Sequence, residues 1–207
     1  MASAPKLLVF LHVAVKQRAF QVELQAALSG IDVTAVGRIA DFDRSLHEGP
    51  DAVLTLPVIL SARGLATSLH GQRQGASNES YALVAADTIP DSARVQSVGA
   101  LDLLGREGTT AFVEQLLSAH PKVERVTKVE DLLPLLQMQR VDAILLPSRL
   151  FPELRASSRL NLASKELSKK VELPALAKLG ASGAQIMSAV GRLPGPLAAA
   201  IGVDEWR

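Results

Sequence analysis

The chain of 207 residues contains no cysteine, few aromatic residues and almost no net charge. Without cysteine it forms no disulfide and has no thiolate for catalysis or metal binding. Aromatic residues make up 3% of the chain, with one Trp and one Tyr, which disfavours a site that holds its ligand by ring stacking. The 22 basic and 21 acidic residues lack the basic excess typical of nucleic-acid-binding proteins. We therefore expect no nucleic acid as a partner.

The sequence also lacks any apolar run of the roughly 18 residues that a membrane helix needs, so we expect no direct membrane insertion. The apolar run from Leu7 to Val15 has the length of a signal-peptide core. An amphipathic helix pattern follows it, however, instead of a cleavage site of small residues. We interpret residues 6–15 as a buried first strand, so an exported form needs a signal that these residues do not supply.

Strand-like and helix-like segments alternate along much of the chain, which is 48% hydrophobic. A first βαβαβ pattern covers a strand at 6–15, a helix at 17–29, a strand at 31–39, a helix at 41–48 and a strand at 51–56. A second one covers a strand at 98–104, a helix after the turn at 105–110, a strand at 123–129, a helix at 130–139 and a strand at 142–146. Such alternation predicts parallel sheets joined by right-handed crossovers.

Two similar strings close these two patterns. GPDAVLTLP spans 49–57 and VDAILLP spans 141–147, and each places an acid before an apolar run and a proline after it. Strands that are apolar almost throughout are typical of parallel sheets covered on both faces. The sequence therefore predicts an α/β fold with two lobes, each a mostly parallel sheet flanked by helices.

The remaining segments carry weaker patterns. Residues 61–80 are polar and glycine-containing, and we expect a loop with at most one helical turn. We expect strands at 81–86 and 171–179, a helix at 183–193 and a short helix at 197–206, with the end of the chain packed on the first lobe. The predicted division is a first lobe made of 1–82 and 160–207 and a second lobe made of 83–159.

Three stretches together resemble the second lobe of the type 2 periplasmic solute-binding proteins: SVGALDLLGREGTTAFVEQLL, VERVTKVEDLLPLLQ and VDAILLPSRL. GRIADFDRSLHEGPDAVLTLPVIL resembles the end of their first lobe, and IMSAVGRLPGPLAAAIGVDEW resembles their C-terminal helices. The phosphate- and phosphonate-binding branch is the branch that we expect.

The resemblance implies two α/β lobes, joined by crossing strands, that close over a small molecule. Many members of the family deliver this ligand to the permease of an ABC transporter, and others are sensor domains, effector domains of regulators or enzymes. We therefore expect a monomeric protein that binds a small-molecule anion without a cofactor or metal, with a permease as a further partner. The expected location is the periplasm or another exported compartment, with the cytoplasm as the alternative.

The turn at 105–110 is the most informative candidate site. A strand, a turn with glycine and hydroxyl residues, and a helix together present free backbone N–H groups and the positive end of a helix dipole. Thr109 or Thr110 can cap this helix, and Arg106 adds a positive charge. One interpretation is a site for a carboxylate, phosphate or phosphonate, which the family resemblance favours. The alternative is an ordinary helix N-cap.

Other candidates follow the predicted strands, because ligands of open α/β sheets bind at the carboxyl ends of strands. Lys16 and Arg18 follow the first strand, where the alternative is a solvated helical turn. Thr55 interrupts an apolar strand and either contacts ligand or bonds to backbone. Matching places after the two prolines are occupied by Ser61 and Arg63 in the first lobe and by Ser148 and Arg149 in the second. For these four residues, the alternative is an ordinary solvated surface.

Enzyme signatures are missing from the sequence. The four histidines, at positions 12, 47, 70 and 120, show no metal-binding spacing, and neither GxSxG nor a phosphate-binding P-loop is present. We expect no catalytic residue and hence no enzyme. A degenerate member that acts through protein contacts, and an enzyme on the same scaffold, are the alternatives.

Overall fold

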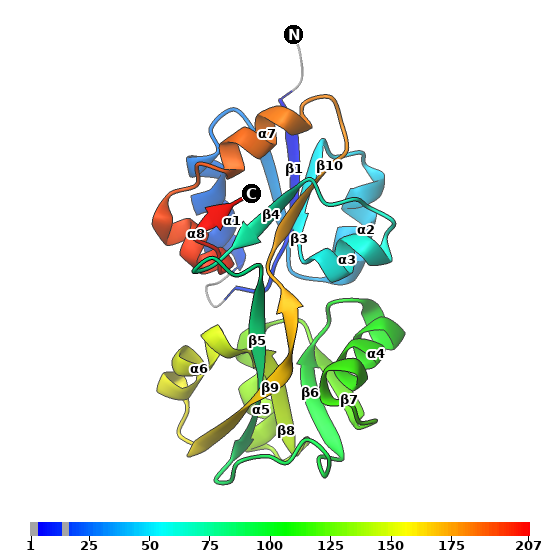
Figure 1. Cartoon of the computed structure of the whole chain (residues 1–207), viewed down its shortest axis with the longest axis vertical. Coiled ribbons are helices and arrows are strands. Elements are labelled where there is room, and N and C mark those ends of the chain that lie inside the picture. The colour runs from blue at the N-terminus through cyan, green and yellow to red at the C-terminus, as the bar shows by residue number, and fades with distance from the viewer. Residues whose placement is uncertain (1–3, 14–16) are drawn as a thin grey trace. The chain divides into compact units, whose positions relative to one another are not determined.

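The computed structural model describes residues 4–13 and 17–207, which form two compact α/β units. Unit 1 comprises Met1–Asn78 and Glu172–Arg207, and unit 2 comprises Glu79–Val171. The chain therefore passes from one unit to the other twice. In each unit, helices pack against a central sheet (Figure 1).

Part of the element order repeats between the units: three strands, each followed by a helix. Unit 1 contains β1 (Lys6–Phe10), α1 (Gln17–Ala27), β2 (Asp32–Val36), α2 (Ile39–His47), β3 (Ala52–Thr55), α3 (Pro57–Ala62), β4 (Leu69–Gln72), β10 (Ala175–Lys178), α7 (Gly183–Val190), α8 (Gly195–Ile201) and β11 (Glu205–Trp206). Unit 2 contains β5 (Asn78–Ala86), β6 (Ser97–Leu101), α4 (Gly105–Leu117), β7 (Lys122–Val126), η1 (Val129–Asp131), α5 (Leu132–Gln137), β8 (Ala143–Pro147), η2 (Ser148–Leu150), α6 (Phe151–Ser157) and β9 (Leu162–Glu172). The repeated order runs from β1 to α3 in unit 1 and from β6 to α6 in unit 2. Strands β5 and β9 contain the two crossings.

Both sheets are mixed. The order in unit 1 is β11-β4-β10-β3-β1-β2, with β1 parallel to β2 and β3 and the other pairs antiparallel. The order in unit 2 is β7-β6-β8-β5-β9, with β6 parallel to β7 and β8 and with β5 antiparallel to β8. The two predicted βαβαβ patterns are confirmed as β1–β3 and β6–β8.

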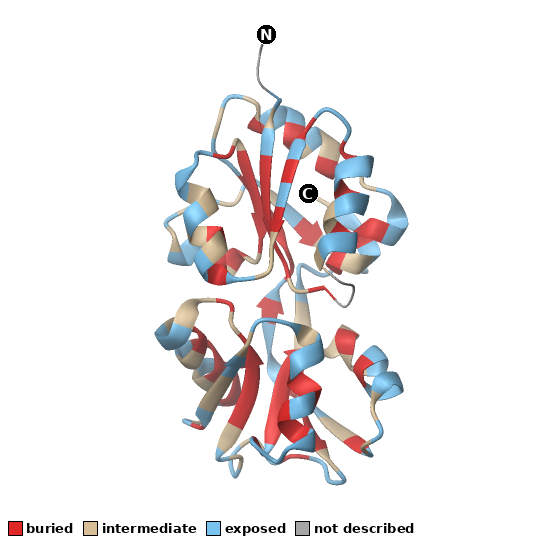
Figure 2. Ribbon diagram, turned by 180° about the vertical axis from the view of Figure 1, so that it is seen from behind, coloured by how far each residue is buried: buried red, intermediate tan, exposed pale blue. Residues whose placement is uncertain are grey.

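The strands of the two repeated strings are the most buried of their sheets (Figure 2). All four residues of β3 and all five of β8 are buried. In unit 1 the core includes the first strand and α1 and reaches α7 and α8 near the end of the chain. The prediction that both strings are strands covered on two faces is confirmed.

The acid of each repeated string has the same structural role. Asp51 Oδ2 accepts the backbone N–H of Lys6 at the start of β1, with an N–O distance of 2.9 Å. Asp142 Oδ2 accepts the N–H groups of Gln96 and Ser97 at the start of β6, at 3.0 and 2.9 Å. Each carboxylate therefore ties the buried strand that follows it to the start of its parallel neighbour.

Several predicted elements are wrong in extent. The segment 61–80, predicted as a loop, contains β4 and the start of β5, because β4 forms only through pairing with β10 and β11. The strand predicted at 171–179 is divided between the end of β9 and β10, around Pro174, which has no N–H to donate. The helix predicted at 197–206 ends at Ile201, and Glu205–Trp206 pairs with β4 instead. The first strand ends at Phe10, and residues 14–15 lie outside the described residues.

We expect Asp142→Ala to lower the free energy of unfolding by about 1–2 kcal/mol, because two backbone N–H groups lose a charged acceptor. Denaturant unfolding of both proteins measures this difference. Asp131→Ala is the control, since Asp131 is an exposed acid of the same unit. Equal stability of the two variants contradicts the role assigned to Asp142.

Candidate functional site

In unit 2, the candidate residues lie at the edge where the parallel strands end. Since β6 and β8 are parallel neighbours, the start of α4 and the start of η2 lie at the same edge of the sheet. Strand β5 is antiparallel to β8, with Tyr81 opposite Pro147, so its first residues reach this edge as well. We call this the unit 2 carboxyl edge.

The turn from β6 into α4 is held by a buried hydroxyl. Thr109, which is fully buried, accepts the N–H of Leu104 and donates to Asp102 Oδ1, with both distances at 3.0 Å. Asp102 Oδ2 in turn accepts from Arg125 Nη1 at 2.7 Å. Gly105 has φ +79°, a conformation that favours glycine and lets the chain enter the helix here. Thr109 therefore supports the turn from within.

The first turn of α4 carries donors without a capping side chain. Leu104 occupies the N-cap position and makes no side-chain cap. The N–H groups that begin at Gly105 are the ones that an α-helix leaves without an intrahelical acceptor. Arg106 is exposed and, within the described part of the chain, forms no ion pair. Thr110 does not cap the helix, because its hydroxyl donates to the carbonyl oxygen of Arg106 at 2.8 Å.

A second polar group lies on the α4 side of the sheet. The Tyr81 ring packs on Phe112 of α4, with ring centroids 5.9 Å apart, and alternation along β5 places Glu79 on the same face. Arg149 Nε donates to Glu79 Oε2 at 3.1 Å, and these two side chains are only 12% and 10% exposed. Ser148 is adjacent, and its hydroxyl oxygen is buried without a hydrogen-bond partner in the described structure.

In unit 1, two of the candidates are committed to bonds within the protein. The Thr55 hydroxyl donates to the carbonyl oxygen of Phe10 at 2.7 Å, which is the backbone bond that the sequence left as an alternative. Arg63 at the end of α3 donates from Nε and Nη2 to the two carboxylate oxygens of Asp43, both at 3.0 Å. Ser61 is exposed on α3.

The other unit 1 candidates lie near the start of α1. Arg18 is exposed in the first turn, and Lys16 lies outside the described residues. The side-chain amide nitrogen of Gln17 is buried, without a partner in the described structure, and lies beside Gly37 just after β2.

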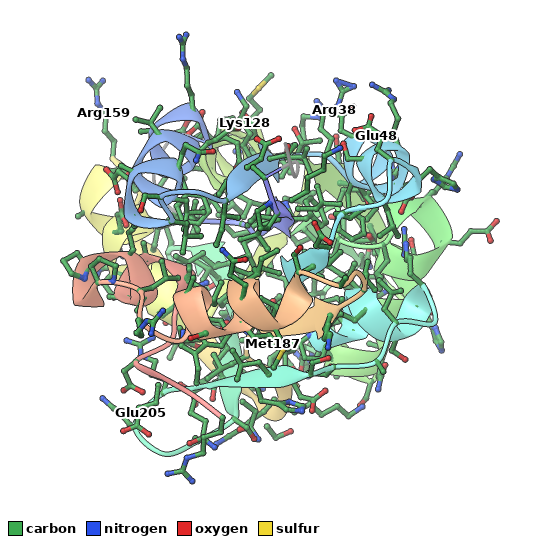
Figure 3. The ribbon with its side chains drawn as sticks, turned by 90° about the horizontal axis from the view of Figure 1, so that it is seen from above. Arg38, Glu48, Lys128, Arg159, Met187 and Glu205 are labelled. Atoms are coloured by element: carbon green, nitrogen blue, oxygen red, sulfur yellow. The ribbon has the colours of Figure 1, made fainter. Side chains whose placement is uncertain are left out.

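Figure 3 shows Arg38 and Glu48 at the two ends of α2, where both side chains extend outward.

Sequence reasoning missed the acidic partners of Arg63 and Arg149 and the tyrosine of unit 2. Asp102 directly follows the observed β6 but lies inside the strand predicted at 98–104, so the predicted bounds concealed its place at the carboxyl edge. The pairing of Glu79 with Arg149 spans 70 positions and that of Asp43 with Arg63 spans 20, and no local pattern connects them. Across residues 4–13 and 17–207, no three acidic or histidine side chains are grouped to hold a metal ion. None of the helices described is both long and apolar enough to span a bilayer.

No protein-family model matches this chain, and no curated protein matches it either. Solved structures do match over nearly its whole length. XAC2383 from Xanthomonas citri bound to ATP has a TM-score of 0.66 at 11% identity, over 99% of this chain and 91% of that one. The periplasmic VFT2 domain of Bordetella pertussis BvgS has a TM-score of 0.60 at 14% identity, over 96% and 92%. The GluR0 ligand-binding core from Nostoc punctiforme in complex with L-glutamate has a TM-score of 0.60 at 9% identity, over 90% and 91%.

These likenesses show the fold. The chain has the two-lobed α/β fold of the type 2 periplasmic-binding-protein class, as the sequence predicted. At identities of 9–14% they do not extend to a ligand, and they do not single out the phosphate and phosphonate branch.

We expect Thr109→Val to lower the free energy of unfolding by about 1–3 kcal/mol, since the partly buried N–H of Leu104 and the carboxylate of Asp102 lose a partner. Thr110→Val is the matched control, because its hydroxyl bonds only within its own helix and a change of at most about 0.5 kcal/mol is expected. Thermal or denaturant unfolding compares the two variants. Equal stability of Thr109→Val and Thr110→Val contradicts a supporting role of the Thr109 hydroxyl in the turn.

Burial raises the pKa of the Tyr81 phenol, nearby Glu79 raises it further, and Arg149 lowers it by less. Because the pKa is higher in the folded state, protonated Tyr81 contributes to the free energy of unfolding. This contribution is fully present below the unfolded pKa of about 10 and is lost as pH rises above it. Tyr81 is the single tyrosine of the chain, so its ionisation can be followed by ultraviolet absorbance. We expect a midpoint well above pH 10 that falls to the free-tyrosine value on unfolding in denaturant; equal midpoints contradict burial of the phenol.

Proposed function

We propose that this protein is a solute-binding protein whose two units close over a small anionic ligand. No covalent step is required, since affinity comes from burying the ligand and from charge-assisted hydrogen bonds. Closure of the units is then the signal that a partner reads, either the permease of an ABC-type transporter or the remainder of a sensor. We propose an exported, periplasmic location and a monomeric state.

The uncapped start of α4 is the observation that carries this proposal. Free N–H groups and the positive end of the helix dipole lie there at the carboxyl ends of parallel strands, beside Arg106, which has no ion pair among the described residues. This edge is where open α/β sheets bind ligands. Ser148 adds a buried hydroxyl without a partner, and Arg149 adds a guanidinium whose terminal nitrogens make no hydrogen bond within the described structure.

Unit 1 supplies the other half of the proposed site. Its carboxyl edge carries Thr55, the Arg63–Asp43 pair and the start of α1. We propose that Lys16, Arg18 and Ser61 contribute further contacts there. We add Gln17, because its buried amide nitrogen has no partner among the described residues, a costly arrangement that a ligand oxygen relieves.

A thermal-shift screen tests the proposed function. The compounds are phosphate, methylphosphonate, monocarboxylates and dicarboxylates, amino acids and ATP, with a neutral sugar as the control. A ligand present at about 100 times its dissociation constant stabilises by about 2.7 kcal/mol, which raises the melting temperature by several degrees. A saturable shift with an anion and none with the sugar is the expected result. A screen that is flat for every anion contradicts the anionic ligand and favours a protein that acts through protein contacts.

We expect Arg106→Ala to weaken binding of the anion found in this screen by about tenfold, because a charge-assisted bond is lost. Arg94→Ala is the control, since Arg94 is an exposed arginine in the loop before β6. Calorimetric titration compares the two variants. Equal affinity for both removes Arg106 from the ligand site.

A further inference from the structure

The charges of the unit 2 carboxyl edge cancel one another. Three arginines and three carboxylates belong to it: Arg106, Arg125, Arg149, Glu79, Asp102 and Glu107. Two of the arginines are held by carboxylates, through Arg125–Asp102 at 2.7 Å and Arg149–Glu79 at 3.1 Å. Lys128, Glu130 and Asp131, beyond β7, are exposed, so solvent and salt screen their charges. The formal charges of these six described side chains sum to zero, and the uncapped helix end leaves a partial positive charge.

Within this set, the Arg149–Glu79 pair is the most withdrawn from solvent. Its side chains are 12% and 10% exposed, against 30% and 16% for Arg125 and Asp102. Salt in solution screens such a pair weakly, so a ligand nearby experiences Glu79 almost as strongly as Arg149. Arg149 uses Nε for this bond and retains its two terminal nitrogens as donors. The guanidinium therefore offers hydrogen bonds to a ligand without offering a net charge.

We propose that Glu79 selects ligands by their charge, so that unit 2 binds a singly charged anion more tightly than a dianion. This inference rests on the proposed function and specifies the chemical class of its ligand. One negative group is stabilised by the N–H donors of α4 and by Arg106. A second negative charge on the ligand loses its water beside Glu79. The repulsion from Glu79 cancels the attraction of Arg149, so nothing offsets this cost. Glu79 therefore acts on the ligand through its charge and through its hold on Arg149.

The test uses two probes of nearly identical shape. Succinamate carries one carboxylate and a carboxamide, whereas succinate carries two carboxylates. Each is titrated into the ¹⁵N-labelled full chain at matched ionic strength, and dissociation constants are obtained from the amide shifts of residues 104–110 and 148–150. For the unmodified protein, we expect succinate to bind at least about tenfold more weakly than succinamate. Glu79→Gln is expected to reduce this ratio by about tenfold.

Glu124→Gln is the matched control. Glu124 is a partly buried carboxylate of the same unit that pairs with Arg140, which precedes β8 at the opposite edge of the sheet. The Glu124→Gln substitution removes the same charge from the unit. The ratio of the two dissociation constants is expected to stay within about twofold of the value for the unmodified protein. If Glu79→Gln does not fold, Arg149→Lys and the double variant Glu79→Gln with Arg149→Lys provide the test, because a lysine reaches solvent more readily than a guanidinium when its carboxylate is removed. Both variants keep one cation at position 149, and the ratio is expected to be about tenfold lower in the double variant than in Arg149→Lys alone.

The outcomes separate the two proposals. If residues 104–110 and 148–150 respond to both probes but Glu79→Gln leaves the ratio unchanged, or Arg149→Lys and the double variant show equal ratios, Glu79 does not select charge and the proposed binding function stands. If residues 104–110 and 148–150 respond to neither probe in any variant, the anion site of unit 2 is refuted and the charge selection is refuted with it.

Discussion

The hydrogen bonds of Asp51 and Asp142 to neighbouring strand starts are the interactions on which both units depend. Each carboxylate accepts backbone N–H groups at the start of the adjacent parallel strand, Lys6 in unit 1 and Gln96 with Ser97 in unit 2. These bonds fix the register between β3 and β1 and between β8 and β6. Since a one-residue slip would turn every buried side chain of a strand to the other face, this register also fixes both cores.

The candidate sites follow from the same constraint. Parallel strands in fixed register end together, so the segments that follow them meet at one edge of each sheet. In both units, an arginine that follows the buried strand is held by a carboxylate from another element, Arg63 by Asp43 and Arg149 by Glu79. A partly desolvated guanidinium is strongly disfavoured without such a partner. The paired carboxylates therefore both orient these arginines and reduce the positive charge around them.

The structural neighbours separate what the fold provides from what the side chains provide. A domain of BvgS, a structure holding ATP and a structure holding L-glutamate share this architecture at 9–14% identity. A scaffold that presents helix N-termini at the ends of parallel strands offers a general place for polar ligands. We propose that the choice among ligands depends on groups such as Arg106, Glu79 and Ser148, which the architecture positions without dictating their identity.

The sequence by itself determined the two βαβαβ patterns, the buried strands β3 and β8 and the turn at 105–110, because these depend on local periodicity and on glycine, proline and capping preferences. It did not determine β4 or β11, which exist only because segments about 130 positions apart pair with each other. It nominated Arg149 and Thr109 but not the partners that set their roles. Glu79 lies 70 positions from Arg149, and charge pairing over such a separation leaves no periodic trace in the sequence. Only the tertiary structure decided which arginines are neutralised and which one, Arg106, stays unpaired within the described chain, because the electrostatics of a site depend on distances that the folded backbone creates.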